Sequence, residues 1–114
     1  MKIEKLILGL GIICAVSAGI SAYIDTDPSH ITTVEKALNL RDDTPVILQG
    51  KITKRLKKDK YEFTDPTGQI TVEIDAKDWH GLDVRSTDTV RLYGEVDRDF
   101  LNTEIDVYAI EAIR

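Results

Sequence analysis

The sequence predicts a small all-β domain, a barrel of five strands preceded by one short helix. Two observations carry this prediction. From Val46 onward, apolar residues alternate with polar ones, which is the period of half-buried strands. Within this region the segment YEFTDPTGQITVEID contains two strands joined by Asp65-Pro66-Thr67-Gly68, the residues that a type I turn favours. The hairpin is the clearest local signal in the chain.

Each predicted strand has one apolar face that is expected to point into the barrel. Gly50 and Gly94 fall on this inward face, where a missing side chain lets a strand bend sharply. Closure of the sheet would also hide strand edges that a small domain cannot leave open. The inward residues are expected to be Val46, Leu48, Gly50 and Ile52 in the first strand, Ile70, Val72 and Ile74 in the third, Val90, Leu92, Gly94 and Val96 in the fourth, and Ile105, Val107 and Ala109 in the fifth.

The segment before the first strand predicts a short helix. Thr32 and Glu35 have the spacing of a capping box. Three apolar residues, Val34, Ala37 and Leu38, then fall on one helical face, so a helix of about two turns is expected.

The connection between the third and fourth strands, Ala76 to Asp88, has room for a second helical turn. It carries Trp79 and is expected to end near Gly81. Because tryptophan has a large apolar surface, Trp79 is expected to be buried and to plug the barrel. Five strands with a helical connection after the third form the layout of an OB-fold.

The N-terminus predicts export. Lys2 and Lys5 flank a charged start, and Leu6 to Val16 is an apolar run of signal-peptide length, shorter than the roughly 20 residues of a membrane span. Residues 1–22 are therefore expected to be a signal cleaved after Ala18 or Ala22, with an uncleaved anchor as the alternative. Residues 23–31 would form a flexible arm and residues 32–114 the barrel domain.

Five segments of the chain resemble the bacterial OB-fold proteins of the YgiW/YdeI type: VILQGKI, YEFTDPTGQITVEID, the Trp79-His80-Gly81 step, DTVRLYGEVDRDF and EIDVYAI. The resemblance covers about residues 32 to 113. It implies a periplasmic OB-fold domain linked to stress tolerance, without known catalysis and without a catalytic motif to transfer. The sequence departs from the pattern at Val84-Arg85-Ser86, where a proline near the turn would be expected.

A run of basic residues marks the first candidate binding region. Lys54, Arg55, Lys57, Lys58 and Lys60 fall around the expected loop between the first two strands, a loop that OB-folds use for ligands. Such a cluster can bind phosphate, carboxylate or acidic glycans. The alternative is a solvated hairpin tip whose charges keep the sheet edge soluble.

Acidic residues mark a second region around the loop between the last two strands, at Asp97, Asp99, Glu104 and Asp106. They could attract cationic peptides or polyamines. Aspartates that cap a loop are the alternative. Weak Ca²⁺ binding has little support, because the segment lacks the glycine and the terminal glutamate of an EF-hand loop.

Composition excludes several other functions. Removal of residues 1–22, which carry Lys2, Lys5 and Glu4, changes the formal net charge from −5 to about −6 and leaves no cysteine. General nucleic-acid binding needs basic and aromatic residues, whereas the outward side of the central hairpin carries Glu62 and Glu73. With two histidines and no cysteine in residues 23–114, no usual zinc site or catalytic triad is expected.

The sequence therefore predicts a periplasmic binding or adaptor module without cofactor, metal or enzymatic activity. Its expected partner is a small cationic molecule, a cell-wall glycan or an envelope protein, with no nucleic acid and no stable membrane insertion after signal cleavage. A purely structural or interaction subunit without a small ligand is the alternative. The candidate binding residues are Lys54, Arg55, Lys57, Lys58, Lys60, Glu62, Glu73, Asp97 and Asp99.

Overall fold

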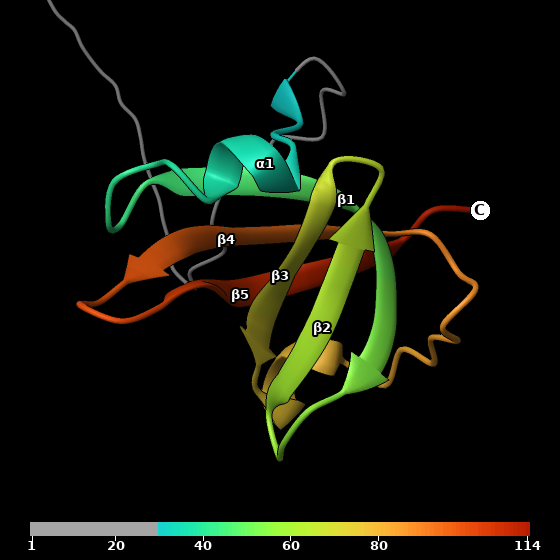
Figure 1. The fold of residues 1–114 in the computed structure, drawn as a ribbon. Helices are drawn as coiled ribbons and strands as arrows, with labels where there is room; N and C mark the ends of the chain where they lie inside the picture. Colours follow the sequence, from blue (N-terminus) through green and yellow to red (C-terminus); the bar gives the residue numbers. More distant parts are fainter. Residues whose placement is uncertain (1–29) are drawn as a thin grey trace, which may run out of the picture.

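The computed structural model describes residues 30–114 (Figure 1). The predicted signal over 1–22, and the predicted arm over 23–31 apart from its last two residues, lie outside the described residues. Among those described, no helix is long and apolar enough to cross a membrane. The elements are α1 (Val34–Ala37), β1 (Pro45–Arg55), β2 (Lys60–Asp65), β3 (Gly68–Ile74), the 3-10 helix η2 (Ala76–Trp79), β4 (Val90–Arg98) and β5 (Thr103–Ala112).

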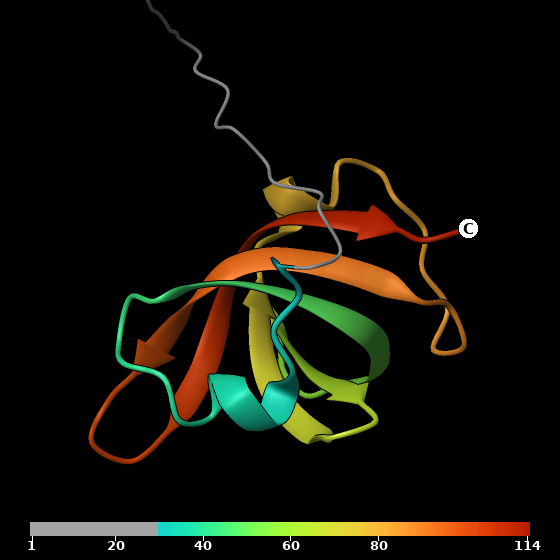
Figure 2. The same ribbon diagram turned by 90° about the horizontal axis from the view of Figure 1, so that it is seen from above.

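The five strands close into a barrel in the order β1-β2-β3-β5-β4, with β4 paired back onto β1. All neighbouring strands are antiparallel except β3 and β5, which run parallel. Figure 2 looks onto the barrel from above and shows the strands wrapping around it. Strand number, strand order and the helical turn after β3 confirm the predicted OB-fold.

Gly50 is the point at which β1 changes partner. Residues Pro45–Gly50 pair with β4, whereas Lys51–Arg55 pair with β2. A Cβ atom on Gly50 would lie 2.3 Å from the backbone oxygen of Thr64. The strand can therefore bend against β2 only because this position has no side chain, as the sequence predicted.

Gly94 on β4 likewise has no room for a side chain, since a Cβ atom there would lie 2.3 Å from the backbone oxygen of Asp106, but at this position the structure corrects the predicted register. Tyr93 pairs with Ala109 and Gly94 with Val107, so Tyr108 is an extra residue on β5. This β-bulge inverts the alternation of inward and outward side chains beyond it. Ala109, which was predicted to face inward, is instead opposite the outward-facing Tyr93, and Ile110 packs against the core.

The barrel encloses one core of aliphatic side chains around a single aromatic ring. Phe63 is the largest side chain that is completely buried. The predicted inward residues of the first, third and fourth strands are confirmed, and so are Ile105 and Val107 of the fifth. The buried residues of this core are Val34, Ala37, Val46, Leu48, Ile52, Phe63, Ile70, Val72, Ile74, Val90, Leu92, Val96, Ile105 and Val107.

The helix α1 is shorter than predicted and begins one residue later. Its N-cap is Thr33, whose side chain accepts a hydrogen bond from the Lys36 amide, and the predicted cap at Thr32 is wrong. Val34 and Ala37 are fully buried, while Leu38 remains 39% exposed. After Ala37 the amides of Asn39 and Leu40 donate to carbonyl oxygens three residues back, so the predicted second turn does not form as α-helix.

The β2–β3 turn holds the start of this helix. The Asp65 carboxylate accepts hydrogen bonds from the Thr67 amide (2.7 Å) and from the Val34 amide (2.9 Å). The Glu35 amide donates to the Thr67 hydroxyl at 3.0 Å. Two free amides of the helix N-terminus are thus satisfied by a turn about thirty residues away in sequence. Asp65 caps its own turn, as predicted, and also caps α1.

We expect Asp65→Ala to lower the free energy of unfolding by about 1 to 2 kcal/mol at pH 7, the usual cost of a lost cap. Burial tends to raise the pKa of Asp65, but hydrogen bonds from Thr67, Val34 and Gly68 hold it below its ordinary value. This contribution is therefore present above the unfolded pKa and is lost as pH falls through the folded pKa. Urea unfolding at several pH values measures both effects.

Asp65→Asn is the matched control, because it keeps an acceptor but cannot ionise. Its stability deficit relative to the wild type should shrink as the pH is lowered. A deficit that stays constant down to pH 2 would contradict the ionic role of Asp65.

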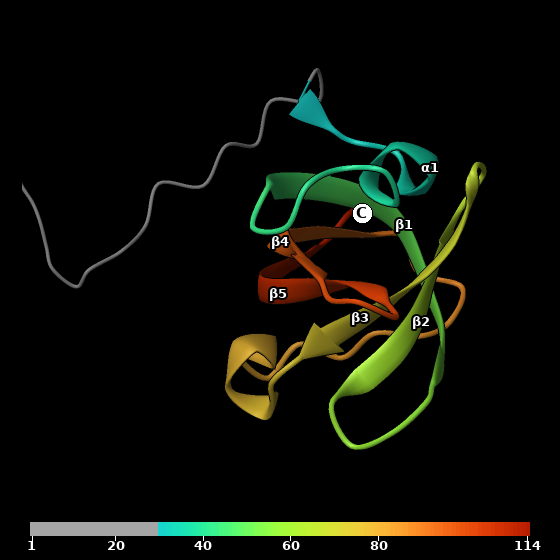
Figure 3. The same ribbon diagram turned by 60° about the vertical axis from the view of Figure 1, so that its left-hand side comes forward.

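The second helical turn lies at the opposite end of the barrel from α1 (Figure 3). It carries Trp79 as predicted and is followed by two residues with positive φ, His80 at 49° and Gly81 at 74°. Trp79 is only partly buried, and its ring meets the edge of Tyr61 at a centroid distance of 5.4 Å. The prediction of a buried plug is therefore wrong, because Phe63 and the aliphatic core already fill the barrel.

Candidate functional site

The outer side of the sheet carries acidic residues in two lateral rows. In the first row Lys60 on β2 is paired with Glu73 on β3, Glu73 with Asp106 on β5, and Asp106 with Glu95 on β4. Neighbouring strands lie about 4.8 Å apart, so these side chains are direct lateral neighbours. Three carboxylates from three strands therefore stand side by side.

A second row runs parallel to the first. Glu62 on β2 is opposite Thr71 on β3, Thr71 is opposite Glu104 on β5, and Glu104 is opposite Asp97 on β4. We call the six carboxylates of the two rows the acidic face. Its members are Glu62, Glu73, Glu95, Asp97, Glu104 and Asp106.

The protonation behaviour of the acidic face reflects its crowding. Partial removal from water raises the pKa of Asp106 above its ordinary value, and the nearby charges of Asp97 and Asp75 raise it further. The pKa of Glu73 is raised mainly by burial and then by the neighbouring carboxylates, although Lys60 opposes this effect. Ionised Glu73 and Asp106 are thus held in surroundings that favour the arrival of a positive charge.

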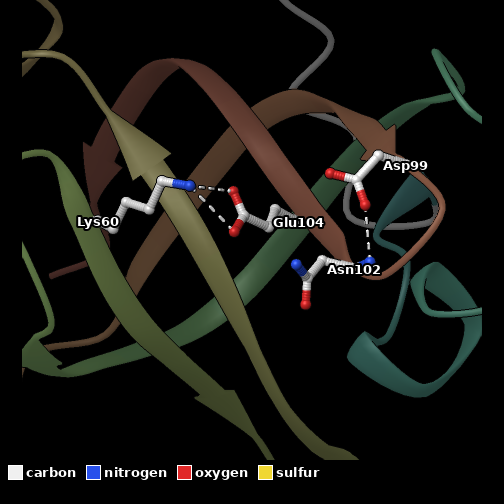
Figure 4. A network of polar contacts seen from close by, with 4 residues as sticks. All are labelled: Lys60, Asp99, Asn102 and Glu104. Atoms are coloured by element: carbon white, nitrogen blue, oxygen red, sulfur yellow. Dashed lines mark hydrogen bonds and ion pairs between the residues drawn. The ribbon is translucent and has the colours of Figure 1, made fainter.

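Lys60 is the cation that links the predicted basic and acidic regions. Its ammonium group lies 2.9 and 3.1 Å from the two carboxylate oxygens of Glu104, as Figure 4 shows. The hydrogen bond and the charge of Glu104 raise the pKa of Lys60, with smaller contributions from Glu73 and Asp97. Lys60 therefore lies on β2 and interacts with the acidic face instead of belonging to the β1–β2 loop.

The remaining basic residues do not converge on a site. Lys54 and Arg55 belong to β1, so the loop is shorter than predicted and contains only residues 56–59. Arg55 donates hydrogen bonds to the carbonyl oxygens of Lys57 and Lys58 and lies 5.9 Å from the ring of Tyr61. Lys54, Lys57 and Lys58 are exposed. Whether these residues bind an anion or keep the hairpin tip soluble stays a prediction.

The β4–β5 loop is organised by Asp99. Its carboxylate accepts hydrogen bonds from the amides of Leu101 and Asn102, both at 2.8 Å. Figure 4 shows the bond from Asn102. These bonds hold the pKa of Asp99 below its ordinary value. Asp99 thus has the loop-capping role, while the turn leaves Phe100 99% exposed and Leu101 80% exposed.

Two further anchors fix this loop. Arg98 donates to the carbonyl oxygens of Leu38 and Leu40, and its own amide donates to Asp42. We call Phe100 and Leu101 the apolar tip. Phe100 and Leu101 are thus an exposed apolar pair on a turn that hydrogen bonds hold in place.

Sequence reasoning named Glu104 and Asp106 in the acidic region without listing them as candidate binding residues, and it did not name Glu95 at all. Glu95 lies on the outward register of β4 beside Asp106. The alternation along β4 already indicated that it points outward. Its lateral neighbours depend on the pairing of β4 with β5, which the sequence does not reveal. Glu62 accepts a hydrogen bond of 2.6 Å from the Thr53 hydroxyl and marks the rim of the face.

The chemical capacity of the acidic face is electrostatic. Within residues 30–114, no group of three or more His, Cys, Asp or Glu side chains is arranged to hold a metal ion. The carboxylates are spread over four strands at the spacing of a sheet. This spacing suits a ligand with several separated positive charges more than a single small ion.

The closed barrel, its strand order and the ligand loops on either side of the acidic face define an OB-fold protein. Comparison with known proteins makes the assignment specific. Residues 15–112 match the family described as bacterial OB fold (BOF) protein. The chain belongs to this family, which confirms the resemblance found in the sequence.

Two relatives have known names. The calcium-regulated OB-fold protein CarO of Pseudomonas aeruginosa is 52% identical over 83 residues, which cover 73% of this chain and 72% of CarO. Protein YgiW of Escherichia coli K12 is 49% identical over 83 residues, 73% of this chain but less than two thirds of YgiW (64%). Neither these names nor the family description denotes an enzyme.

Solved structures agree with this assignment. The structure of YgiW from E. coli has a TM-score of 0.72 with 49% identity and covers 73% of this chain and 89% of that one. The telomere capping protein Ten1 of Saccharomyces pombe has a TM-score of 0.57 with 13% identity, covering 73% of this chain and 79% of Ten1. The second likeness concerns the fold alone.

Proposed function

We propose that this chain is an exported, non-catalytic binding module of the bacterial envelope whose acidic face takes a ligand with several positive charges. The observation that supports this most directly is the pair of carboxylate rows across β2, β3, β5 and β4. The rows hold six carboxylates; the Lys60 ammonium group contacts Glu104 at 2.9 Å, and the exposed Lys54 is opposite Glu62 at the edge of the second row.

The position of the acidic face supports the same function. It lies between the β1–β2 and β4–β5 loops, where OB-folds hold their ligands. Ligands recognised there by other OB-folds include nucleic acids, but those need a basic groove with stacking aromatic residues. The carboxylates here would instead repel phosphates and attract polyamines or basic peptides.

We expect spermine to bind the wild-type domain and to bind about tenfold more weakly to Glu95→Gln/Asp106→Asn. Both substitutions remove charge while keeping side-chain size. Binding should weaken with salt, because exposed charges are screened over about 8 Å at physiological ionic strength. It should also weaken as pH falls toward the raised pKa values of Glu73 and Asp106. Calorimetric titration at two salt concentrations and two pH values measures these effects.

The matched control is Lys57→Ala/Lys58→Ala, which should leave spermine binding unchanged or slightly stronger. The acidic-face variant should be at least as stable as the wild type at neutral pH, because a raised folded pKa means that ionised Asp106 destabilises the fold there. Weaker binding would then not result from unfolding. Equal spermine affinity of the wild type and the acidic-face variant would contradict the proposal.

Two other probes separate the remaining ligand classes. The name of CarO suggests Ca²⁺ as a probe, which we expect to act as a screening salt because the described residues form no metal-binding group. Co-sedimentation with purified cell-wall sacculi tests a glycan ligand. If the domain binds sacculi and loses this binding when the five basic residues between Lys54 and Lys60 are replaced by alanine, the ligand-binding site would lie at the β1–β2 loop and not on the acidic face. The mass of the chain from a periplasmic extract tests export and the cleavage site.

The apolar tip favours a second candidate function, an interaction subunit without a small ligand. Phe100 and Leu101 are exposed on a turn that Asp99 and Arg98 hold in place. If this function holds, Phe100→Ser/Leu101→Ser abolishes the interaction with a protein partner, whereas the acidic-face variant retains it. The same two variants therefore distinguish the two functions.

A further inference from the structure

A cavity of about 590 Å³ lies between η2 and the C-terminal half of β5, one outward row of side chains beyond Glu95 and Asp106 of the acidic face. The loop after η2 contributes Leu82 to its wall, and β4 contributes Tyr93. Figures 1 and 3 show η2 at the end of the barrel opposite α1. This cavity is not among the regions that the sequence singled out.

The β-bulge of β5 creates the space. Because Tyr108 is an extra residue, Ala109 rather than a larger residue lies beside Tyr93 on the outer side of the sheet. A methyl group there leaves room that a long side chain would fill. In the next row along the same outer side of the sheet, Glu111 on β5 is paired with Arg91 on β4.

Two aromatic side chains form walls of the cavity. Trp79 is held by its edge-to-face contact with Tyr61, so it does not depend on a ligand for its orientation. Tyr93 is only 4% exposed, although it is on the outer side of the sheet, and it lines the cavity together with Gly81 and Leu82 of the loop after η2. Aromatic faces of this kind attract organic cations as well as apolar groups.

Glu111 is the only carboxylate in the lining, and neither lysine nor arginine lines the cavity. One of its oxygens accepts a hydrogen bond from the Tyr93 hydroxyl at 2.8 Å, and Arg91 lies 3.9 Å from the same oxygen. The Glu111 side chain remains 47% exposed, so a ligand can reach it. Burial and the bond to Glu111 raise the pKa of Tyr93, which keeps the phenol protonated and oriented.

We propose that this cavity is a second binding site, for a small organic cation with a flat apolar body. The body would lie between Trp79, Tyr93 and the aliphatic lining, and the ammonium group would lie against Glu111. An apolar pocket with a few convergent polar groups is the usual form of a small-molecule site. The acidic face differs from it because that surface is open and has no aromatic wall.

Trp79 is the single tryptophan of the chain, so its fluorescence reports on this cavity. The probe is phenethylamine, with 2-phenylethanol and 3-phenylpropanoate as matched neutral and anionic analogues and spermidine as a cation without an apolar body. We expect phenethylamine to cause a saturable change in Trp79 fluorescence with a dissociation constant of roughly 1 mM, which is usual for a ligand of this size. The alcohol should bind at least fivefold more weakly and the carboxylate should not bind.

Three variants decide the result. Glu111→Gln should reduce phenethylamine affinity to that of the alcohol. Ala109→Leu should weaken the binding of both, because its side chain takes the space beside Tyr93 where the apolar body would lie. The acidic-face variant Glu95→Gln/Asp106→Asn should weaken phenethylamine binding much less than Glu111→Gln does, because its two carboxylates lie one row of side chains outside the cavity lining. This difference separates the site from the proposed function. The NMR spectrum of each variant serves as the control that the variant is folded.

Two outcomes would overturn the proposal. One is that phenethylamine and 2-phenylethanol bind with equal affinity to both the wild type and Glu111→Gln, which would show that the cavity does not recognise the positive charge of the ligand. The other is that none of the probes changes the Trp79 fluorescence or its indole NMR signal up to 20-fold above the expected dissociation constant, which would leave the cavity without a ligand of this class.

Discussion

Replacing Gly94 by alanine is expected to destabilise the domain by about 3 kcal/mol, the upper part of the range for steric overpacking. The added Cβ would lie 2.3 Å from the backbone oxygen of Asp106 and 3.0 Å from the Cα of Val107. Both atoms belong to the backbone of β5 and cannot rotate away as a side chain would. The β4–β5 pairing would have to separate at the bulge.

Such a loss is a large part of the stability of a domain this small, which by size is about 4 to 13 kcal/mol. It corresponds to a decrease in melting temperature of more than about 10 °C. Urea and thermal unfolding measure it. Gly81→Ala is the comparison: its Cβ would contact nothing within 4 Å, but φ is +74°, so a cost of about 1 kcal/mol is expected from conformation alone. Equal effects of the two substitutions would show that β5 relaxes around the new methyl group.

Truncation of Phe63 is expected to have the largest effect of any single large-to-small change in the core. The ring is completely buried and is the largest such side chain in the barrel. Phe63→Ala should lower the free energy of unfolding by about 3 to 5 kcal/mol, through lost burial and the cavity left behind. Denaturant titration at pH 7 gives the value directly.

The second phenylalanine of the chain provides the control. Phe100 is 99% exposed at the apolar tip, so Phe100→Ala should change stability by no more than about 0.5 kcal/mol. A loss above 1 kcal/mol at Phe100 would mean that the tip has a structural role and would weaken the case for an interaction site there.

The strands could be predicted from sequence because their signals are local. Period-two alternation identified the inward residues of β1, β3 and β4, and turn chemistry identified Asp65 to Gly68. Gly50 and Gly94 were recognised as bending points because each interrupts an apolar face. The family resemblance rested on the same segments, and the match over residues 15–112 confirms it.

The errors share a physical cause, which is contact between segments far apart in the chain. The bulge at Tyr108 adds one residue relative to β4, and no pattern within β5 alone reveals it, so Ala109 was placed on the wrong side. The single turn of α1 is enough because a distant turn caps it. The sequence could place Trp79 on a helical turn but could not predict how far its side chain is buried. Its burial depends on which other side chains already fill the barrel interior.

The candidate site was predictable only in part for a similar reason. The clusters of charged residues in the sequence indicated that basic residues lie near the β1–β2 loop and acidic residues near the β4–β5 loop. Which of them are neighbours depends on strand register, which places Glu95 beside Asp106 and Lys54 opposite Glu62. Whether these residues bind a ligand stays a prediction that the titrations above address.

The cap that Asp65 provides has a consequence for the order of folding. A helix of four residues cannot nucleate alone, because forming the first turn fixes several residues for one hydrogen bond. The amides of Val34 and Glu35 find their acceptors only on the completed β2–β3 turn. We therefore expect the hairpin to form first and α1 to dock late, so that Asp65→Ala accelerates unfolding and leaves the folding rate nearly unchanged. The N-terminal segment of the domain would be the last part to become native and the first to leave.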